Sequence, residues 1–287
     1  MEDHPGTLLE FEEQFSSERD CRDYLAMLRW PDGFRCPRCC NDEAWSRRNG
    51  LYECASCGLQ TSVTSGTIFQ DTKKPLRVCF RAIWHVTGHK YGANALGLQR
   101  VLGLGSYRTA WSWLHKLRRA MVRPSLDRLS GVVQVDESYI GGEKPGKRGR
   151  GAAGKLLILI AAQVDGTRIG RVRLRRIPDA SAANLETAVQ QSVEPGSVVR
   201  TDRWQGYNQL SRFGYTHELV RQGTDVGGDL LPFCHKTAGI LKRWLLGTLQ
   251  GAVSQEHLDY YLDEFTFRFN RRTSRSRGKL FCRPVFN

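Results

Sequence analysis

The sequence predicts an α/β domain of about 155 residues preceded by two small modules. After residue 130, short runs of β-branched residues alternate with stretches of helical periodicity, which is the pattern of a sheet covered by helices. Residues 34–72 are instead rich in Cys, Gly and Ser, with short Thr/Val/Ile stretches that suit hairpins around a metal ion. Residues 75–125 form a helical and strongly basic segment between these two parts.

The composition is that of a folded, basic protein. The 287 residues include 43 Lys and Arg against 29 Asp and Glu, so the formal net charge is +14, and 40% of the residues are hydrophobic. No segment approaches the ~18 consecutive apolar residues of a membrane span, and the acidic N-terminal sequence lacks the layout of a secretory signal. A membrane protein and a secreted protein are therefore disfavoured. The positive charge indicates a polyanionic partner, and nucleic acid is the simplest one.

The first 33 residues predict an acidic helical lead-in. Residues 1–35 hold 4 basic and 9 acidic side chains, so this segment is not expected to touch a polyanion. Apolar residues between positions 8 and 30 recur at helical spacing, which predicts one or two short helices. The residues expected to share their apolar faces are Leu9, Phe11, Phe15, Tyr24, Leu25 and Leu28.

Two CxxC pairs predict a zinc ribbon over residues 34–72. Fourteen residues separate the pair Cys36 and Cys39 from the pair Cys54 and Cys57. Four thiolates at this spacing can surround one Zn²⁺ tetrahedrally, which leaves no open coordination position and makes the metal structural rather than catalytic. The alternative is a set of reduced thiols without metal.

The remaining cysteines predict no further site. Cys40 adjoins the first pair and could compete as a ligand, but the CxxC spacing favours Cys39. The others have no partner at ligand spacing and are expected to be ordinary free thiols; they are Cys21, Cys79, Cys234 and Cys282.

The basic helical segment predicts a helix-turn-helix within residues 75–125. Residues 76–131 hold 10 basic side chains and a single acidic one. Within residues 92–121, a helix, the turn LGLGS and a second helix follow one another, as in a module that places its second helix in a DNA groove. The cations expected to contact DNA are Arg108, Lys116, Arg118 and Arg119. The alternative is an ordinary helical hairpin with Trp111, Trp113 and Leu114 in its core.

The elements of the α/β domain follow in order after residue 130. The run GVVQVDESYIGG predicts a strand, and the polar stretch at 141–155 is too flexible in composition to pack. Residues 155–164 and 168–177 predict two strands joined by a hairpin at Asp165-Gly166. A helix at 179–193, with Asp179 or Ser181 as its cap, precedes a strand at 197–202. Residues 236–270 are expected to be helical, and an extended Arg/Ser-rich tail follows.

Two carboxylates are the candidate catalytic groups of this domain. Asp136 ends the run VVQV and Asp202 ends the run SVVRT, so both are expected at strand ends, where their side chains can converge. Two such Asp residues can hold a pair of Mg²⁺ ions that activate a water or a hydroxyl for in-line attack on phosphorus. A single Asp at a strand end is more often a turn or cap residue. The similar surroundings DESYIGG and TDRWQGY favour the catalytic interpretation.

His235 and Lys242 are candidates for the same site. They lie seven residues apart in a predicted helix, about two turns, so they share one helix face. His235 could complete a metal shell or position the nucleophile, and Lys242 could neutralise developing charge or hold a backbone phosphate.

Taken together, these segments resemble a bacterial insertion-sequence transposase with an ISXO-type DDE domain. The resemblance extends from about residue 10 to about residue 281. Besides the two small modules, the motifs that carry it are DESYIGG, TDRWQGY, LKRWLLGTLQGAVS and YLDEFTFRFNRR, of which the last is the most specific. The resemblance implies a ribonuclease-H-like catalytic domain over 130–287, preceded by the lead-in (1–33), the zinc ribbon (34–72) and the helix-turn-helix (75–125).

The resemblance also implies an activity. Such transposases use Mg²⁺ to cut transposon ends and join the 3′ hydroxyls to target DNA. Asp136 and Asp202 match the first two catalytic acids, and the third family position, which is Glu, Asn or His followed seven residues later by Lys, matches His235 and Lys242. We therefore expect Mg²⁺ (or Mn²⁺) at the catalytic site, structural Zn²⁺, terminal-repeat and target DNA as partners, a homo-oligomer on DNA, no membrane association and a location in the bacterial cytoplasm.

Some features depart from the family pattern. His235 replaces an acid at the third position and lowers the negative charge available to the metals. Arg203 stands where Gly commonly separates Asp from Trp, so its charge would either disturb metal binding or add a phosphate contact. The end FCRPVFN differs from the longer family C-terminus. The rival interpretations are a DNA-binding regulator, a catalytically decayed transposase copy, and a nuclease that shares the site without strand transfer.

Overall fold

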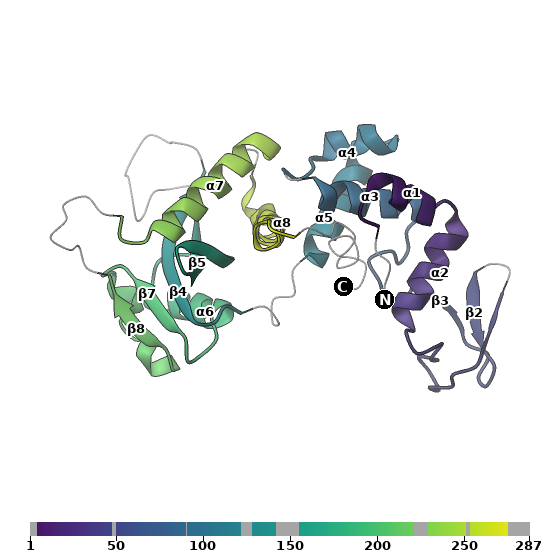
Figure 1. The fold of residues 1–287 in the computed structure, drawn as a ribbon, viewed down its shortest axis with the longest axis horizontal. Helices are drawn as coiled ribbons and strands as arrows, with labels where there is room; N and C mark the ends of the chain where they lie inside the picture. The colour runs from purple at the N-terminus through teal and green to yellow at the C-terminus, as the bar shows by residue number, and fades with distance from the viewer. Residues whose placement is uncertain are drawn as a thin grey trace. The chain divides into compact units, whose positions relative to one another are not determined.

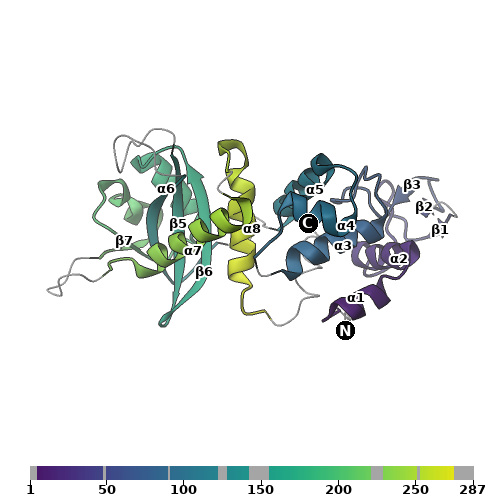
Figure 2. The same cartoon turned by 90° about the horizontal axis from the view of Figure 1, so that it is seen from above.

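The computed structural model describes residues 5–47, 50–89, 91–121, 128–141, 155–220, 229–250 and 253–274. These residues form two compact units, one up to Met121, to which Ser274 also belongs, and one from Arg128 to Thr273 (Figures 1 and 2). Residues 142–154 of the predicted flexible stretch and residues 275–287 of the predicted tail lie outside the described residues. Within the described ranges, no helix is long and apolar enough to cross a membrane.

Two short helices open the first unit, α1 (Leu8–Gln14) and α2 (Glu18–Arg29), where the acidic lead-in is predicted. Their buried aromatic side chains pack on α3 (Leu76–Gly88), and the ring centroids of Phe15 and Phe80 are 5.0 Å apart. The carboxylate of Glu18 accepts hydrogen bonds from the backbone N–H groups of Leu76 and Arg77, both at 2.9 Å, and so caps α3. Leu9, expected on a shared apolar face, is 74% exposed. The lead-in is therefore part of a helical core.

A small antiparallel sheet follows α2, as the predicted hairpins require. Its strands β1 (Ala44–Ser46), β2 (Leu51–Cys54) and β3 (Gln60–Ser62) pair in the order β1-β2-β3. Later in the same unit, α4 (Ala95–Leu102) and α5 (Tyr107–Ala120) form the helix, turn and helix expected within 92–121. The side chain of Asn94 accepts a hydrogen bond from the N–H of Gly97 at 2.7 Å and begins α4, and Gly103, with φ of +60°, ends it.

The second unit is built on a mixed five-stranded sheet of order β6-β5-β4-β7-β8. Its strands are β4 (Val132–Ile140), β5 (Leu156–Asp165), β6 (Arg168–Ile177), β7 (Val198–Thr201) and β8 (Thr216–Leu219). β4, β5 and β6 pair antiparallel, with the predicted hairpin at Asp165-Gly166, and β7 and β8 join β4 in parallel. With helices on both faces, this sheet has the ribonuclease-H-like fold.

Each face of this sheet has its own core. α6 (Ala182–Ser192) packs on the face that contains Val133 and Val135 of β4. α7 (Pro232–Leu249) and α8 (Leu258–Asn270) pack on the other face, on Ile158 and Ile160 of β5. Side chains alternate between the faces along a strand, so Gln134 and Asp136 of β4 lie on the α7 side. The described residues of the unit also include the 3-10 helices η1 (Gln205–Tyr207), η2 (Leu210–Phe213) and η3 (Gln255–His257).

The motif YLDEFTFRFNRR has a structural role at the end of α8. Glu264 is fully buried, and its carboxylate pairs with Arg268 at 2.8 Å one turn later. The side chain of Asn270 bonds the backbone of Val172 in both directions, accepting at 2.7 Å and donating at 3.0 Å. Because β6 is an edge strand, these bonds satisfy backbone groups that would otherwise be unpaired. The motif thus anchors α8 to the sheet edge.

Candidate functional site

The four cysteines of the CxxC pairs converge on one point. The sulfur atoms of Cys36, Cys39, Cys54 and Cys57 all lie within 4.8 Å of one another, with Cys36 and Cys57 3.6 Å apart and Cys39 and Cys54 3.5 Å apart. A tetrahedral Zn²⁺ with bonds of about 2.3 Å to sulfur separates two ligands by about 3.8 Å. The cluster therefore fits the predicted structural zinc site.

Both pairs adopt the same turn, and this turn explains Cys40. The N–H of Cys40 donates to the carbonyl of Cys36 at 3.0 Å, and the N–H of Gly58 donates to that of Cys54 at 3.0 Å. Cys40 and Gly58 thus occupy equivalent positions, and their φ angles of +59° and +66° lie in the left-handed region that favours glycine. Cys40 is a turn residue beside the cluster rather than one of the four grouped sulfurs.

Backbone N–H groups within the turns prepare two sulfurs for metal binding. The N–H of Cys39 makes the largest contribution to lowering the pKa of Cys36 to about 6, and the N–H of Cys57 likewise lowers the pKa of Cys54. The thiolate is the form that binds a metal, so these N–H groups favour the required state at Cys36 and Cys54, whereas the neighbouring sulfurs raise the pKa of Cys39 to about 12.

The other described cysteines behave as buried apolar residues. Burial raises the pKa of Cys21 and of Cys79 to about 12, and it raises the pKa of Cys234 as well. They are neutral thiols in the core, as predicted. Cys282 lies outside the described residues.

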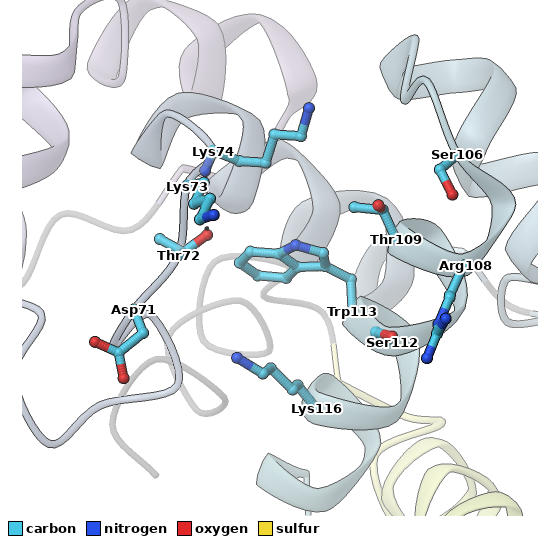
Figure 3. A pocket seen from close by; sticks show the side chains of 10 residues that line it. All are labelled: Asp71, Thr72, Lys73, Lys74, Ser106, Arg108, Thr109, Ser112, Trp113 and Lys116. Carbon is cyan, nitrogen blue, oxygen red and sulfur yellow. Dashed lines mark hydrogen bonds between the residues drawn. The ribbon is translucent and has the colours of Figure 1, made fainter.

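Three of the four cations predicted to contact DNA are exposed on α5. Arg108, Lys116 and Arg119 reach the surface, and the first two are seen in Figure 3. The prediction for Arg118 is wrong, because this side chain is only 2% exposed and its Nη2 donates to the carbonyl of Ala93 at 3.4 Å. Arg118 follows the buried Leu114 by one helical turn and so lies on the inner face of the helix.

The alternative of a helical hairpin with an aromatic core is also partly realised. Trp113 and Leu114 are 9% and 1% exposed, and Trp111 is half-buried. A packed inner face and a cationic outer face coexist on α5, so the two interpretations do not exclude each other.

The two predicted carboxylates lie on neighbouring strands of the large sheet. Asp202 directly follows β7, as expected, but Asp136 lies within β4 rather than at its end, because residues 137–140 continue to pair with β5. The parallel register of β4 and β7 pairs Gln134 with Arg200. Asp136 and Asp202 each follow two residues later, so they lie level with one another on the same face of the sheet. The strands therefore bring together two residues that are 66 positions apart.

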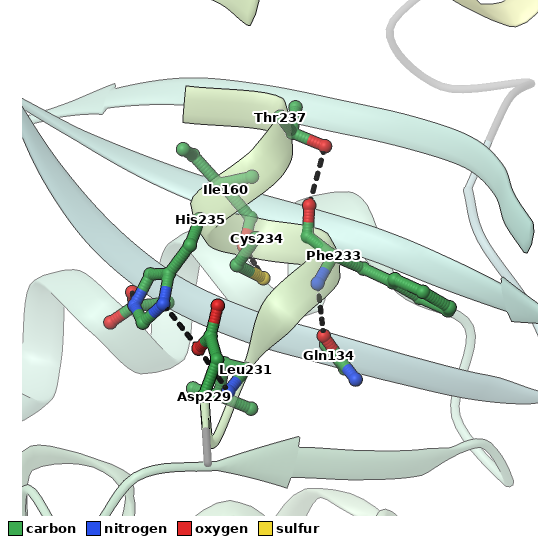
Figure 4. A network of polar contacts seen from close by, with 9 residues as sticks. Gln134, Ile160, Asp229, Leu231, Phe233, Cys234, His235 and Thr237 are labelled. Atoms are coloured by element: carbon green, nitrogen blue, oxygen red, sulfur yellow. Dashed lines mark hydrogen bonds and ion pairs between the residues drawn. The ribbon is translucent and has the colours of Figure 1, made fainter. Parts of the chain in front are cut away.

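His235 joins this site from the first turn of α7. Its Nε2 lies 3.1 Å from Oδ2 of Asp136, and its Nδ1 lies 2.5 Å from Oδ1 of Asp229 (Figure 4). The imidazole is thus held between two carboxylates. Asp136 is largely covered, with a side chain 16% exposed, whereas 55% of the His235 side chain remains accessible.

Asp229 is a site residue that the sequence reasoning missed. Besides holding His235, its Oδ1 accepts a hydrogen bond from the N–H of Leu231 at 3.2 Å and so begins the turn into α7. An Asp three residues before a Pro at a helix start is a usable signal for such a cap. That signal does not reveal contact with a histidine six positions further along.

Two contacts fix α7 against the sheet at this site. The backbone N–H of Phe233 donates to Oε1 of Gln134 at 3.0 Å, and the thiol of Cys234 donates to the carbonyl of Ile160 at 3.5 Å (Figure 4). Gln134 lies two residues before Asp136 on the same face of β4. The start of α7, and with it His235, is therefore docked directly beside Asp136.

The TDRWQGY motif shapes the second carboxylate. Oδ1 of Asp202 accepts the N–H of Trp204 at 2.9 Å, and Nε1 of Trp204 donates to the carbonyl of Ala180 at 2.9 Å. A Cβ atom at Gly206 would lie 2.7 Å from a methyl group of the buried Leu185, so a larger residue would have to displace that side chain. Arg203, which lies between Asp202 and Trp204, is exposed.

The electrostatics of Asp136 favour a cation beside it. Burial raises the pKa of Asp136 above its ordinary value, and the charge of Asp202 raises it further, against the opposing effects of the Glu137 N–H and of His235. Carboxylate oxygens such as those of Asp136 and Asp202 are ligands that Mg²⁺ and Mn²⁺ prefer. The donor set therefore fits a divalent cation.

The site is looser than the cysteine cluster. Among the residues that the structure describes, the cysteines alone form a group of three or more potential ligands within 4.8 Å of one another. Lys242 is exposed on α7, and no contact between it and Asp136, Asp202 or His235 is seen in the described part of the chain. The structure thus brings together the two aspartates and His235, but not Lys242.

Two transposase domains match the sequence of this chain. The ISXO2-like transposase domain matches residues 128–270, and the transposase zinc-ribbon domain matches residues 16–60. The chain belongs to this transposase family. The match to the ISXO2-like transposase domain contains both aspartates, His235 and Lys242, and the match to the zinc-ribbon domain contains all four clustered cysteines. The zinc-ribbon match begins at residue 16 and includes α2, so it starts earlier than the sequence pattern predicts.

Other proteins resemble the transposase over most or part of its length. An uncharacterized protein in the transposable element ISH50 of Halobacterium salinarum is 28% identical over 290 residues, which cover 92% of this chain and 94% of the relative. The crystal structure of the catalytic core domain of BIV integrase is 17% identical, with a TM-score of 0.32 over 47% of this chain and 82% of the other.

Proposed function

We propose that this transposase cuts DNA at the ends of its insertion sequence and joins the freed 3′ ends to target DNA. The observation that best supports the proposal is the placement of Asp136 and Asp202 at the same level of neighbouring strands, with Nε2 of His235 3.1 Å from Oδ2 of the first. Paired carboxylates on one face suit phosphodiester chemistry with divalent cations. The family assignment makes DNA the substrate to test.

The site would hold Mg²⁺ (or Mn²⁺) through Asp136 and Asp202, with His235 as a further ligand or neighbour. When bound, the ion supplies Lewis-acid activation of the phosphodiester and of the attacking oxygen. His235 replaces an acid common in the family, and its contact with Asp229 keeps Nδ1 occupied so that Nε2 faces Asp136. Lys242 is exposed two turns further along α7, where it would hold a backbone phosphate.

Both proposed steps are exchanges at phosphorus. In the first, a water oxygen bonds to phosphorus and the bond to the 3′ oxygen breaks, which leaves a 3′ hydroxyl and a 5′ phosphate. In the second, that 3′ oxygen bonds to a target phosphorus and displaces the 3′ oxygen of the target strand. Each attacking group loses one proton and each leaving oxygen gains one. Asp136 and Asp202 would serve both steps because a DNA phosphodiester is attacked in each.

The exposed cations of α5 would hold the DNA during these steps. Arg108, Lys116 and Arg119 lie on the accessible side of the helix, where they can meet phosphates. We also propose a homo-oligomer on DNA, because an insertion sequence has two ends and each needs a catalytic site.

The proposal is tested by Asp136→Asn and Asp202→Asn in a strand-cleavage assay on a candidate terminal repeat with Mg²⁺. Asn preserves size but removes the charge needed to hold the ion, so both variants should lose cleavage while DNA binding remains. Asp165→Asn, at the exposed hairpin of the same domain, is the matched control and should cleave normally. Retained cleavage in either site variant would refute the assignment. Wild-type protein that binds but does not cleave would indicate a regulator or a decayed copy instead.

A further inference from the structure

A basic pocket of about 560 Å³ lies in the N-terminal unit, between α5 and the segment that precedes α3 (Figure 3). Lys73 and Lys74 line it from the segment, and Arg108 and Lys116 line it from α5, against a single carboxylate, that of Asp71. Hydroxyl groups of four Ser and Thr side chains complete the polar lining. Two elements separated in sequence therefore contribute equally to one concentration of positive charge.

The four cations are available to a ligand. All four residues are exposed, and within the described ranges none of them forms an ion pair with a carboxylate. Like charges gathered around one pocket repel each other, and an anion in the pocket relieves this repulsion. The lining groups are also hydrogen-bond donors, as phosphate oxygens require.

The segment that carries the two lysines is anchored to the helical core. Phe69 is fully buried, and its carbonyl accepts the N–H of Thr72 at 3.1 Å. The N–H of Lys74 donates to Oγ1 of Thr72 at 3.4 Å, and the carbonyl of Lys74 accepts from the thiol of Cys79 on α3 at 3.8 Å. The backbone under Lys73 and Lys74 is thus held before any ligand binds, which lowers the entropic cost of binding.

We propose that this pocket binds the phosphate backbone of duplex DNA, with Lys73 and Lys74 contacting phosphates across from Arg108 and Lys116. The inference rests on the proposed function, in that DNA is taken as the substrate. Trp113 is the one aromatic side chain of the lining and is only 9% exposed, which leaves too little of its ring to stack an unpaired base. The linker between the zinc ribbon and α3 is therefore a second DNA-contacting element beside α5.

The test measures binding of the full chain to a fluorescent 30-base-pair duplex of arbitrary sequence by anisotropy, from about 50 to about 200 mM KCl. Each lost phosphate contact lowers the magnitude of the slope of log Kd against log salt by about 0.9, so K73A/K74A should lower it by about 1.8. At 0.1 M salt this corresponds to a loss of affinity of up to about 60-fold. K73R/K74R should bind like wild type because the charges remain.

The matched control is R168A/R212A, which also removes two positive charges, but from exposed positions of the other unit. If K73A/K74A changes the slope no more than this control does, the pocket proposal is overturned. Equal zinc content and far-UV circular dichroism show that the variants are folded, and recovery in K73R/K74R separates lost charge from lost structure. Wild type that binds steeply with salt but never cleaves would contradict the proposed function while leaving the pocket supported.

Discussion

Asp229 is predicted to act on the catalytic site through His235, and two substitutions separate this role from helix capping. Its Oδ1 accepts from Nδ1 of His235 at 2.5 Å and from the N–H of Leu231 at 3.2 Å. Asp229→Asn keeps an oxygen for the Leu231 N–H but removes the charge that holds the imidazole. Asp229→Ala removes both interactions. The first variant should therefore weaken the site without weakening the start of α7.

The size of the effect follows from the exposure of the pair. A hydrogen bond to a charged group contributes about 1.5–3 kcal/mol when shielded from solvent. The side chains of His235 and Asp229 are 55% and 45% exposed, so the lower end applies. About 1.4 kcal/mol corresponds to roughly a tenfold loss in affinity for the metal. This agrees with the 10- to 100-fold range typical of residues that orient a metal ligand.

The assay is a titration of the full chain with Mn²⁺, in which the free ion is followed by electron paramagnetic resonance. Asp229→Asn should bind Mn²⁺ about tenfold more weakly than wild type, and in a His235→Ala background it should cause no further loss. A purely structural role would instead lower thermal stability and persist in that background. Equal Mn²⁺ affinity of wild type and Asp229→Asn would refute the reasoning.

Three further predictions concern the zinc cluster, a half-buried acid and the inner face of α5. Cys39→Ser should release zinc, whereas Cys40→Gly should retain it. Cys40→Gly should also raise the free energy of unfolding by about 1 kcal/mol, because the φ of +59° at this position suits glycine. Zinc analysis and urea unfolding check both variants, and zinc loss from Cys40→Gly would contradict the turn assignment. Burial, and then a neighbouring aspartate, raise the pKa of Asp263 to about 7. Because this folded-state pKa lies above that of the unfolded chain, the free energy of unfolding should fall as pH rises from about 4 through 7. The free energy of unfolding of Asp263→Asn should exceed that of wild type by up to about 4 kcal/mol at pH 8 but match it near pH 4. Urea midpoints that do not diverge with pH would oppose this. Arg118→Ala should lower the free energy of unfolding by about 1–3 kcal/mol, because Arg118 is buried. Arg119 is exposed, so Arg119→Ala should change that free energy by less than about 0.5 kcal/mol. Similar urea midpoints for the two variants would contradict this distinction.

Much of the fold could be predicted because its signals are local. The CxxC spacing reports a turn of a few residues, and the same turn is formed twice around the cysteine cluster. The hairpin at Asp165-Gly166 likewise depends on adjacent residues, and Gly166 adopts the positive φ that the turn needs. Periodicity also located the helices on either side of the turn at 102–106.

The errors arose where a side chain's direction depends on distant packing. The charge of Arg118 predicts a DNA contact, but its place one turn after Leu114 puts it in the core. Asp136 was predicted at a strand end, but pairing with β5 extends β4 through Ile140. Local residue patterns predict neither the register between two strands nor the face on which a helix packs.

The sequence alone determined the chemistry that is available to this protein: four thiols at zinc-ligand spacing, blocks of positive charge, and two aspartates that follow β-branched runs. Only the tertiary structure decided which of these groups meet. The parallel register of β4 and β7 sets Asp136 level with Asp202, and the docking of α7 on Gln134 brings His235 and Asp229 to them. The physical reason is that residue type and spacing act over one or two turns of chain, whereas a site is completed by backbone pairing and packing between segments many residues apart.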